Sequence, residues 1–248
     1  MKDIHNHILY NIDDGSNSYQ KSIEILNNLE KRGVTDIVAT PHYIIGTNYN
    51  SDNNKKLELL NQLKKETNIN LYIGNEVYLD TDILDYIKSN EISTINNSRY
   101  LLVELPLNEK LECANELIFE LRNNGIVPIL AHPERYHYFS IDDLKKFIDQ
   151  GCLLQGNITS LLGKYGKNAN DNLKLLLKKR MIHVLGTDTH LTSNIDIEKC
   201  LRIIKQIVGD DIYLDLLERN FDKIINNEKI VSYEIIDKKC WFKKEQIK

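Results

Sequence analysis

The sequence predicts an α/β fold with a mainly parallel β-sheet and helices packed against it. Short apolar runs typical of β-strands alternate with segments of 3.6-residue hydrophobic periodicity along the whole chain. This alternation indicates right-handed strand–helix–strand units, which place successive strands parallel to one another. Seven such strands with flanking helices are enough to close, or nearly close, a barrel. An open doubly wound sheet is the alternative, because periodicity does not separate the two.

The predicted elements follow one another in regular order. The helical pattern is clear over residues 22–29 and 172–177, where apolar residues recur on one face. Gly33, Gly125 and Gly151 come directly after helical stretches, where glycine commonly ends a helix. The predicted strands are residues 3–9, 36–40, 70–74, 100–105, 127–131, 152–155 and 183–186.

One domain is the simplest organisation for the 248 residues. No internal repeat, linker or change of composition divides the chain, and this length is common for a single α/β barrel. With 42% hydrophobic residues, the chain can bury a core without disulfides or a structural zinc ion. We therefore expect a single domain over residues 1–248, with residues 238–248 as a loosely held tail.

Charge and composition argue against several classes of function. The net charge of −4 gives no support to nucleic-acid binding, which usually requires a basic face. No apolar run approaches the roughly 18 residues of a membrane span, so membrane insertion is not expected. The N-terminus, MKDIHNH, has charges and histidines where a signal peptide has its apolar segment. Four widely spaced cysteines without a CxxC pair indicate reduced thiols and a cytoplasmic protein.

Side chains that commonly bind metals stand at the carboxyl ends of several predicted strands. His5 and His7 are two residues apart, so both imidazoles face the same side of a strand. In a parallel barrel these strand ends open on one face, where active sites are found. So many nitrogen and oxygen ligands exceed the needs of one ion, and the pattern predicts a multinuclear metal-dependent phosphoesterase. The residues are His5, His7, His42, Glu76, Glu104, His132, Asp188 and His190.

The loop Asp13-Asp14-Gly15 follows the first predicted strand. Asp-Gly is a strong turn signal, and an aspartate of this loop can also bring a further carboxylate to the site. The residues alone leave open which of the two aspartates faces inward. Two histidines remain outside the metal site: we expect a structural role for His183, at the start of a strand, and a surface-loop position for His137.

Five strings occur in order between residue 3 and about residue 190: HNH (5–7), TPH (40–42), GNEV (74–77), AHPERY (131–136) and GTDTH (186–190). Together they resemble the PHP (polymerase and histidinol phosphatase) superfamily. More narrowly, they resemble its bacterial manganese-dependent protein-tyrosine phosphatases, which are associated with capsular and exopolysaccharide synthesis. The HNH string with the Asp-Asp-Gly loop, and the HPERY string, are specific to that branch.

The resemblance implies a distorted (β/α)7 barrel that holds three divalent metal ions. Manganese is the ion that the family implies, while iron, cobalt and zinc also suit imidazole and carboxylate ligands. By motif, Glu76 is a bridging ligand, and Asp14 is the ligand of the Asp-Asp pair. The implied sets are His5, His7, Glu76 and Asp188 for the first ion, Glu76, Glu104 and His132 for the second, and Asp14, His42 and His190 for the third.

The resemblance also implies how substrate is held. Arg135 matches the phosphate-contacting arginine of the family, whereas residues 191–196 lack the second arginine that this branch often carries. Three divalent ions and four ligand carboxylates leave a positive charge that suits a phosphomonoester dianion, with Arg135 as a bidentate donor. Tyr43 and Tyr136 flank ligand positions, and we expect them to stack on an aromatic substrate. No cysteine has an arginine six positions later, so a Cys-x5-Arg phosphatase loop is excluded.

These features favour a protein-tyrosine phosphatase. The phenoxide leaving group of tyrosine, with a pKa of about 10, departs with less proton assistance than an alkoxide. By resemblance, the substrate is the tyrosine-rich tail of a bacterial tyrosine kinase. Histidinol-phosphate phosphatase on the same scaffold is the alternative. An amidohydrolase-type enzyme lacks support because no lysine ends a predicted strand, and a non-catalytic scaffold that keeps metal for stability is a further alternative. The sequence sets no oligomeric state.

Overall fold

All paired strands in the structure run parallel to their neighbours, as the sequence predicts. The computed structural model describes residues 1–191 and 195–236. Its strands form a three-stranded sheet in the order β1-β2-β4 and a six-stranded sheet in the order β3-β5-β6-β7-β8-β9. The strands are β1 (Lys2–Asn6), β2 (Asp36–Ala39), β3 (His42–Tyr43), β4 (Asn70–Ile73), β5 (Glu76–Tyr78), β6 (Tyr100–Glu104), β7 (Val127–Ala131), β8 (Leu153–Asn157) and β9 (Val184–Gly186).

The seven predicted strands are all present, and two of them are each followed, after a short break, by a further strand that was not predicted. The chain leaves the sheet after Ala39 and re-enters it at His42, and it does the same between Ile73 and Glu76. The two breaks lie side by side, because the Glu76 N–H donates to the Pro41 carbonyl at 3.1 Å. Beyond the breaks β3 and β5 pair in a new sheet, with His42 opposite Glu76. The described strands therefore form two parallel sheets instead of the one continuous ladder of a closed barrel.

Hydrogen bonds join the end of the first strand to the residues that follow the last strand. The Asp188 N–H donates to the His5 carbonyl at 2.9 Å, and the His7 N–H donates to the Thr189 carbonyl at 3.0 Å. A single parallel bridge joins Asn6 to Thr189. These bonds bring the end of β1 beside the residues that follow β9, so metal-ligand motifs more than 180 residues apart meet at one edge.

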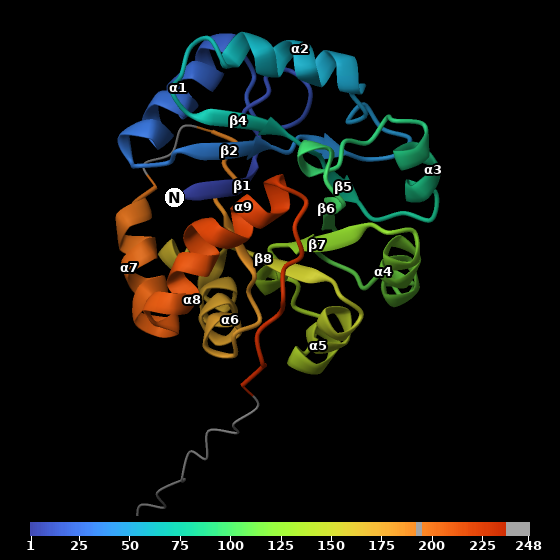
Figure 1. Cartoon of the computed structure of the whole chain (residues 1–248), viewed down its shortest axis with the longest axis vertical. Coiled ribbons are helices and arrows are strands. Elements are labelled where there is room, and N and C mark those ends of the chain that lie inside the picture. The colour runs from blue at the N-terminus through green and yellow to red at the C-terminus, as the bar shows by residue number, and fades with distance from the viewer. Residues whose placement is uncertain (192–194, 237–248) are drawn as a thin grey trace, which may run out of the picture.

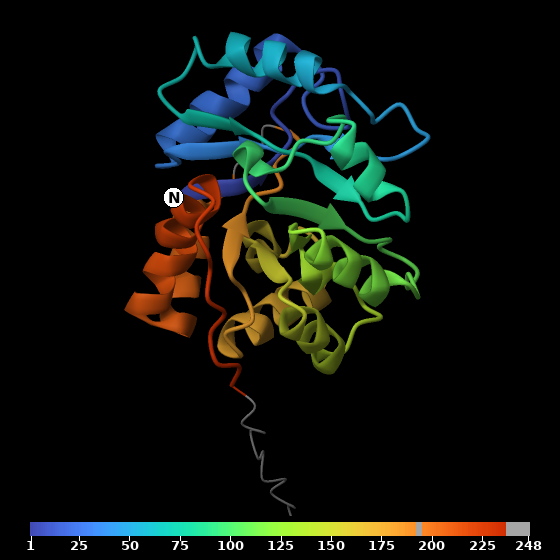
Figure 2. The same cartoon turned by 45° about the vertical axis from the view of Figure 1, so that its right-hand side comes forward.

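The helices surround the strands on the outside (Figures 1 and 2). A cluster of buried side chains lies between the helices and the strands, and a second one includes inward-facing residues of β1, β2 and β6 to β9. The helices are α1 (Tyr19–Lys31), α2 (Asn53–Leu63), α3 (Ile83–Lys88), α4 (Ala114–Asn123), α5 (Ile141–Asp149), α6 (Gly166–Lys178), α7 (Ile197–Val208), α8 (Asp210–Leu214) and α9 (Asn220–Ile225). Short helical turns are η1 (Ile95–Asn97), η2 (Pro133–Arg135), η3 (Ile158–Leu162) and the π-turn η4 (Asp215–Arg219).

Helix α9 packs against the inner cluster at the end of the strands opposite the metal-ligand motifs. Its Phe221 and Ile224 are buried together with Ile4 of β1 and Val184 of β9. The chain then crosses the starting ends of β6 to β8, as Figure 1 shows. Within residues 1–191 and 195–236, no helix has the length and apolarity needed to span a membrane. The expected tail, residues 238–248, lies outside the described residues.

Candidate metal centre

The sequence-predicted ligands converge at the carboxyl ends of the strands. Three groups of side chains in the described part of the chain bring their ligand atoms within 4.8 Å of one another. His5 is on β1, His42 on β3, Glu76 on β5 and Glu104 on β6, while the others follow β1, β7 and β9. The groups are His5, His7 and Glu76; His42, Glu76 and Glu104; and His7, Asp14, His42 and His190.

The tautomers of His5 and His7 indicate a cation between them. The Nδ1 atom of His5 lies 3.0 Å from Gln155 Oε1, which also accepts from the backbone N–H of His132 and is therefore fixed as an oxygen. The Nδ1 atom of His7 lies 2.8 Å from a carboxylate oxygen of Asp13. Both Nδ1 atoms therefore carry the proton in the neutral rings, and both Nε2 atoms present lone pairs.

Those lone pairs point at one another and at a carboxylate. The Nε2 atoms of His5 and His7 are 3.1 Å apart, and they lie 3.1 Å and 3.3 Å from the same oxygen of Glu76, Oε2. Three acceptors converging in a buried place repel one another unless a proton or a metal ion lies between them. A buried imidazole whose second nitrogen is held by a carboxylate or amide oxygen is the usual arrangement of a metal ligand.

Glu76 occupies the centre of the site. Its Oε2 atom also lies 3.1 Å from His42 Nδ1, and its Oε1 atom lies 3.1 Å from His132 Nε2. His42 Nδ1 is buried and makes no hydrogen bond, although it faces this carboxylate. Glu104 continues the set, with its carboxylate 3.5 Å from His132 Nε2 and 3.7 Å from His42 Nδ1. Glu76 thus faces nitrogens on both of its oxygens, as a bridging ligand does.

Asp13 and Asp14 take different positions. The Asp13 carboxylate is buried; besides His7, it accepts from the backbone N–H groups of His42 at 3.1 Å and of Gly15 at 2.9 Å. Asp14 is about half exposed, and one of its oxygens lies 3.4 Å from His42 Nε2 and 3.3 Å from His190 Nε2. Asp13 is therefore placed to orient ligands, whereas Asp14 is placed to be one.

Asp188 contacts both histidines of the first group and the residues that hold its own carboxylate. Its Oδ1 atom lies 3.6 Å from the Nε2 atoms of both His5 and His7. Its Oδ2 atom accepts hydrogen bonds from Asn157 at 2.9 Å and from the Tyr165 hydroxyl at 3.0 Å. No motif marks these two partners in the sequence, although Asn157 lies at a strand end like the ligand that it supports.

The electrostatics of this cluster are dominated by buried carboxylates that face imidazoles. Burial by itself lowers the pKa of His5, but the charges of Glu76 and Asp188 outweigh it and raise that pKa to about 9. Burial and the charge of Glu76 raise the pKa of Glu104 to about 8. A carboxylate that resists ionisation beside another carboxylate marks a place that requires positive charge. Imidazole and carboxylate donors without a thiolate suit several divalent ions, so the residues present fit a metal centre.

A pocket of about 650 Å³ opens over the ligands. Arg135 lies on its wall, where it donates to Asp188 Oδ2 at 3.3 Å and stacks 4.3 Å over the ring of Tyr165. Lys164 lies beside it, with its ammonium 4.9 Å from the same ring centre. The sequence analysis missed Lys164 and Tyr165, which follow η3 in an ordinary-looking loop. Tyr49 and Tyr78 add aromatic surface to the wall.

The expected stacking role of Tyr43 and Tyr136 is wrong. Both side chains are buried, and neither lines the pocket. Tyr43 follows His42 directly on β3; because successive strand residues point to opposite faces, its ring faces the core, where its hydroxyl donates to Glu91 at 3.1 Å. The Tyr136 hydroxyl accepts from the Leu105 N–H at 3.0 Å. Both tyrosines therefore lie in the core beneath the site, next to residues that carry ligands.

The two remaining histidines lie where the sequence analysis placed them. His183 is buried at the start of β9, and its Nδ1 atom accepts from the Leu154 N–H at 3.1 Å. His137 is exposed and does not line the pocket.

Comparisons with known proteins agree with this site. The family model described as "Capsular polysaccharide synthesis, CpsB/CapC" matches residues 1–226. The CapC protein of Staphylococcus aureus is 36% identical, over 98% of this chain and 99% of that protein. The tyrosine-protein phosphatase CpsB of Streptococcus pneumoniae is 29% identical, over 93% of this chain and all of that protein.

A solved structure extends the similarity to three dimensions. It comes from a study of YwqE from Bacillus subtilis and CpsB from Streptococcus pneumoniae, described as unique metal-dependent tyrosine phosphatases. It superposes with a TM-score of 0.88 at 25% identity, covering 95% of this chain and 98% of the other. The resemblance drawn from the motifs is thereby confirmed, and the chain belongs to the CpsB/CapC family of capsular polysaccharide synthesis proteins.

Proposed function

We propose that this protein is a metal-dependent protein-tyrosine phosphatase, a hydrolase of phosphomonoesters, that acts in capsular or exopolysaccharide synthesis. The observation that carries the proposal is the convergence of the His5 and His7 Nε2 atoms on Glu76 Oε2, beneath a pocket with Arg135 on its wall. The relatives named above as tyrosine phosphatases support it.

We propose three divalent ions, with manganese as the physiological metal. The ligand sets are those that the motifs imply, with Asp14 as the aspartate of the third set. The distances of Glu76 to nitrogens on both of its oxygens support its bridging role. Bound ions would supply Lewis acidity and neutralise charge on the phosphoryl group.

The residues of the pocket orient the phosphate. Arg135 is held between Asp188 and the Tyr165 ring, so its guanidinium is already fixed before substrate arrives. A planar fork of donors suits two oxygens of a phosphoryl group. Lys164 adds a second positive charge at the same wall, where residues 191–196 provide no arginine. Asp13 and Gln155 keep His7 and His5 in the tautomers that present Nε2 to the site.

The pocket lining favours an aryl phosphate. Tyr49, Tyr78 and Tyr165 surround the opening together with Ile44 and Leu107. Aromatic rings stack favourably on one another, so a phosphotyrosine ring gains contacts that a small polar alcohol lacks. We further propose the tyrosine-rich tail of a bacterial tyrosine kinase as the substrate. The free thiols of Cys113, Cys152 and Cys200 agree with a cytoplasmic location.

The test compares two substrates on the same metal-loaded enzyme. We expect kcat/KM for a phosphotyrosine peptide to exceed that for histidinol phosphate by at least about tenfold, with manganese, iron, cobalt and zinc tested separately. Preference for histidinol phosphate by a similar factor would overturn the proposal. The variant Arg135→Ala should lose most activity while keeping its unfolding midpoint, because a charged hydrogen bond to phosphate is removed. Unchanged turnover in that variant would show that Arg135 does not hold the phosphate, and absence of turnover in the natural protein would support a non-catalytic scaffold.

A further inference from the structure

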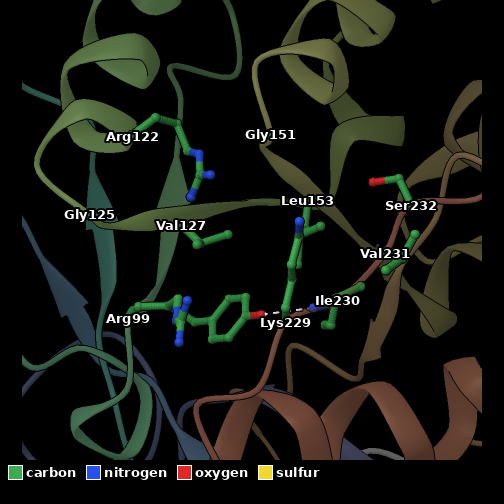
Figure 3. Close-up of a pocket in the computed structure, with 11 residues that line it drawn as sticks. Arg99, Arg122, Gly125, Val127, Gly151, Leu153, Lys229, Ile230, Val231 and Ser232 are labelled. Atoms are coloured by element: carbon green, nitrogen blue, oxygen red, sulfur yellow. Dashed lines mark hydrogen bonds between the residues drawn. The ribbon is translucent and has the colours of Figure 1, made fainter.

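A second pocket lies at the opposite end of the strands from the metal centre. It has a volume of about 610 Å³, which is within the range of pockets that bind small molecules. Tyr100, Val127 and Leu153, the first residues of β6, β7 and β8, line it. Residues 229–232 form one wall (Figure 3). The metal ligands stand beyond the other ends of these strands, so the two pockets are separate sites.

Hydrogen bonds hold the wall of this pocket in place. The Tyr100 hydroxyl donates to the Glu228 carbonyl at 2.6 Å and accepts from the Ile230 N–H at 3.2 Å, the bond drawn in Figure 3. The Arg99 Nε atom donates to Asn227 Oδ1 at 2.9 Å. His183 Nε2 lies 3.1 Å from the Ser232 hydroxyl. The segment after α9 is therefore fixed against the strands, and the pocket exists before any ligand binds.

Positive charge is concentrated in this pocket. Arg99, Arg122 and Lys229 line it, and none of its lining residues is acidic. In the part of the chain that the structure describes, none of the three forms an ion pair with a carboxylate. The Arg122 Nε atom is buried without a hydrogen-bond partner. Unpaired like charges in one concavity are unfavourable on their own and become favourable when an anion lies among them.

The arginine is positioned by the backbone beneath it. Gly151 has φ +87°, and a Cβ atom at this residue would lie 2.8 Å from Arg122 Nε. Glycine therefore permits the Arg122 side chain to lie across the turn that precedes β8. In Figure 3 this side chain extends toward Val127, and Lys229 and Leu153 line the same pocket. Basic and apolar side chains thus line one and the same pocket.

We infer that this pocket binds a small organic phosphate. Three positive charges match the two negative charges of a phosphate monoester better than the single charge of a carboxylate. The Arg99 Nε and Nη2 atoms already donate to Asn227, so Arg99 contributes charge, whereas Arg122 is the guanidinium that suits phosphate oxygens. The apolar side chains of Val127, Leu153 and Ile230 provide a surface for the organic part of the ligand. No metal ligand lines the pocket, so this binding is distinct from substrate binding at the metal centre.

The experiment is calorimetric titration of the metal-loaded enzyme with phenylphosphonate, which is not hydrolysed. We expect two equivalents per chain, one at each pocket. The double variant Arg122→Gln, Lys229→Gln should bind one equivalent, with kcat and KM for a phosphotyrosine peptide unchanged. Lys178→Gln, which removes a positive charge from the exposed end of α6, is the matched control and should bind two. The single variant Lys229→Gln alters only an exposed side chain, so it preserves the test if the double variant folds poorly; it should weaken the second site at least about tenfold.

Two results would overturn the inference: a single equivalent in the unmodified enzyme, or a second equivalent that the variants leave unchanged. Titrations with inorganic phosphate and with benzoate identify the ligand class. Phenylphosphonate should bind the second site at least about tenfold more tightly than either, because only it combines the dianion with an apolar ring. Equal binding of benzoate would exclude the phosphate class. Turnover is read separately, so failure here leaves the phosphatase proposal standing.

Discussion

Asp13 and Asp14 are neighbours in the chain but act on different atoms. Asp13 receives the Nδ1 proton of His7, whereas Asp14 faces the Nε2 atoms of His42 and His190. Asp14→Asn should therefore lower the number of bound metal ions by one per chain. Asp13→Asn should keep that number and weaken metal affinity by about 10- to 100-fold, because the amide no longer fixes the His7 tautomer. Metal titration followed by elemental analysis distinguishes the two, and equal loss of an ion in both variants would refute the assignment.

Lys164 is expected to act on substrate binding. Its ammonium lies at the pocket wall near Arg135 and Tyr165. Lys164→Gln should lower kcat/KM for a phosphotyrosine peptide by about tenfold, which corresponds to about 1.4 kcal/mol for a charged hydrogen bond at a partly solvated site. Lys167→Gln, three residues further along the chain and exposed, is the control and should leave steady-state kinetics unchanged. An equal effect of both variants would indicate general charge attraction instead of a contact.

His183 gives the fold a pH dependence. Burial lowers its pKa from 6.5 to about 4, so the unfolded chain binds a proton there at a higher pH than the folded protein does. The stability that the neutral, buried His183 imidazole contributes is fully present above about pH 6.5. It is lost as the pH falls toward 4. The loss approaches about 3 kcal/mol, at about 1.4 kcal/mol per pKa unit. Urea unfolding measures the free energy of unfolding of the natural protein and of His183→Leu. The difference between the two values should become smaller from pH 7.5 to pH 5. A difference that stays constant would contradict this pH dependence.

The two breaks that precede β3 and β5 are held together by the side chain of one residue. Asn75 stands in the second break; its side chain donates to the Pro41 carbonyl at 3.0 Å and accepts from the Ser93 N–H at 2.8 Å and from the buried Lys56 ammonium. It therefore ties both breaks together just before His42 and Glu76. Asn75→Ala should lower the free energy of unfolding by about 2–4 kcal/mol, because it leaves buried polar groups unpaired.

The same variant should also lose metal, since β3 and β5 carry the ligands that the breaks position. Asn70→Ala is the matched control: Asn70 is exposed at the start of β4, and its side chain donates to Asp36 at 3.0 Å. We expect it to change stability by less than about 1 kcal/mol and to leave metal content unchanged. Normal metal binding in Asn75→Ala would show that the breaks do not position the ligands.

These breaks also mark the limit of prediction from the sequence. The runs before Thr40 and Gly74 are apolar enough to be recognised as strands, and the ligands just beyond them could be recognised from their position at strand ends. The two-residue β3 and three-residue β5 are too short to have a period. Their pairing depends on the Pro41 carbonyl meeting Glu76 and Asn75, which are distant in the chain. The wrong prediction for Tyr43 has a local cause. Tyr43 follows His42 directly on β3, and successive residues of a strand face opposite sides, so a ligand at His42 implies that Tyr43 faces away from the site.

At the scale of the whole molecule, the ligands connect both sheets. His5 belongs to the three-stranded sheet, whereas His42, Glu76 and Glu104 belong to the six-stranded one. Strand β8 provides no predicted ligand, but its Gln155 and Asn157 hold His5 and Asp188. The sequence predicted which ends converge, since that follows from parallel topology. It did not predict the basic pocket at the other end, because that pocket depends on where residues 229–232 return to the strands.

Metal removal should therefore loosen the fold as well as abolish activity. Ions that bind only the folded state stabilise it by about 2.7 kcal/mol when their concentration is a hundred times the dissociation constant. We expect a chelator to lower the unfolding midpoint and re-added manganese to restore it. Glu76→Gln should gain less from manganese, because the bridging charge is lost. Under chelation it should also be less stable than the natural protein, because the imidazoles of His5, His42 and His132 outweigh burial, hold the pKa of Glu76 well below its usual range and lose that carboxylate partner. If manganese stabilised Glu76→Gln as much as it stabilises the natural protein, the role of this cluster as a metal cross-link between the two sheets would be wrong.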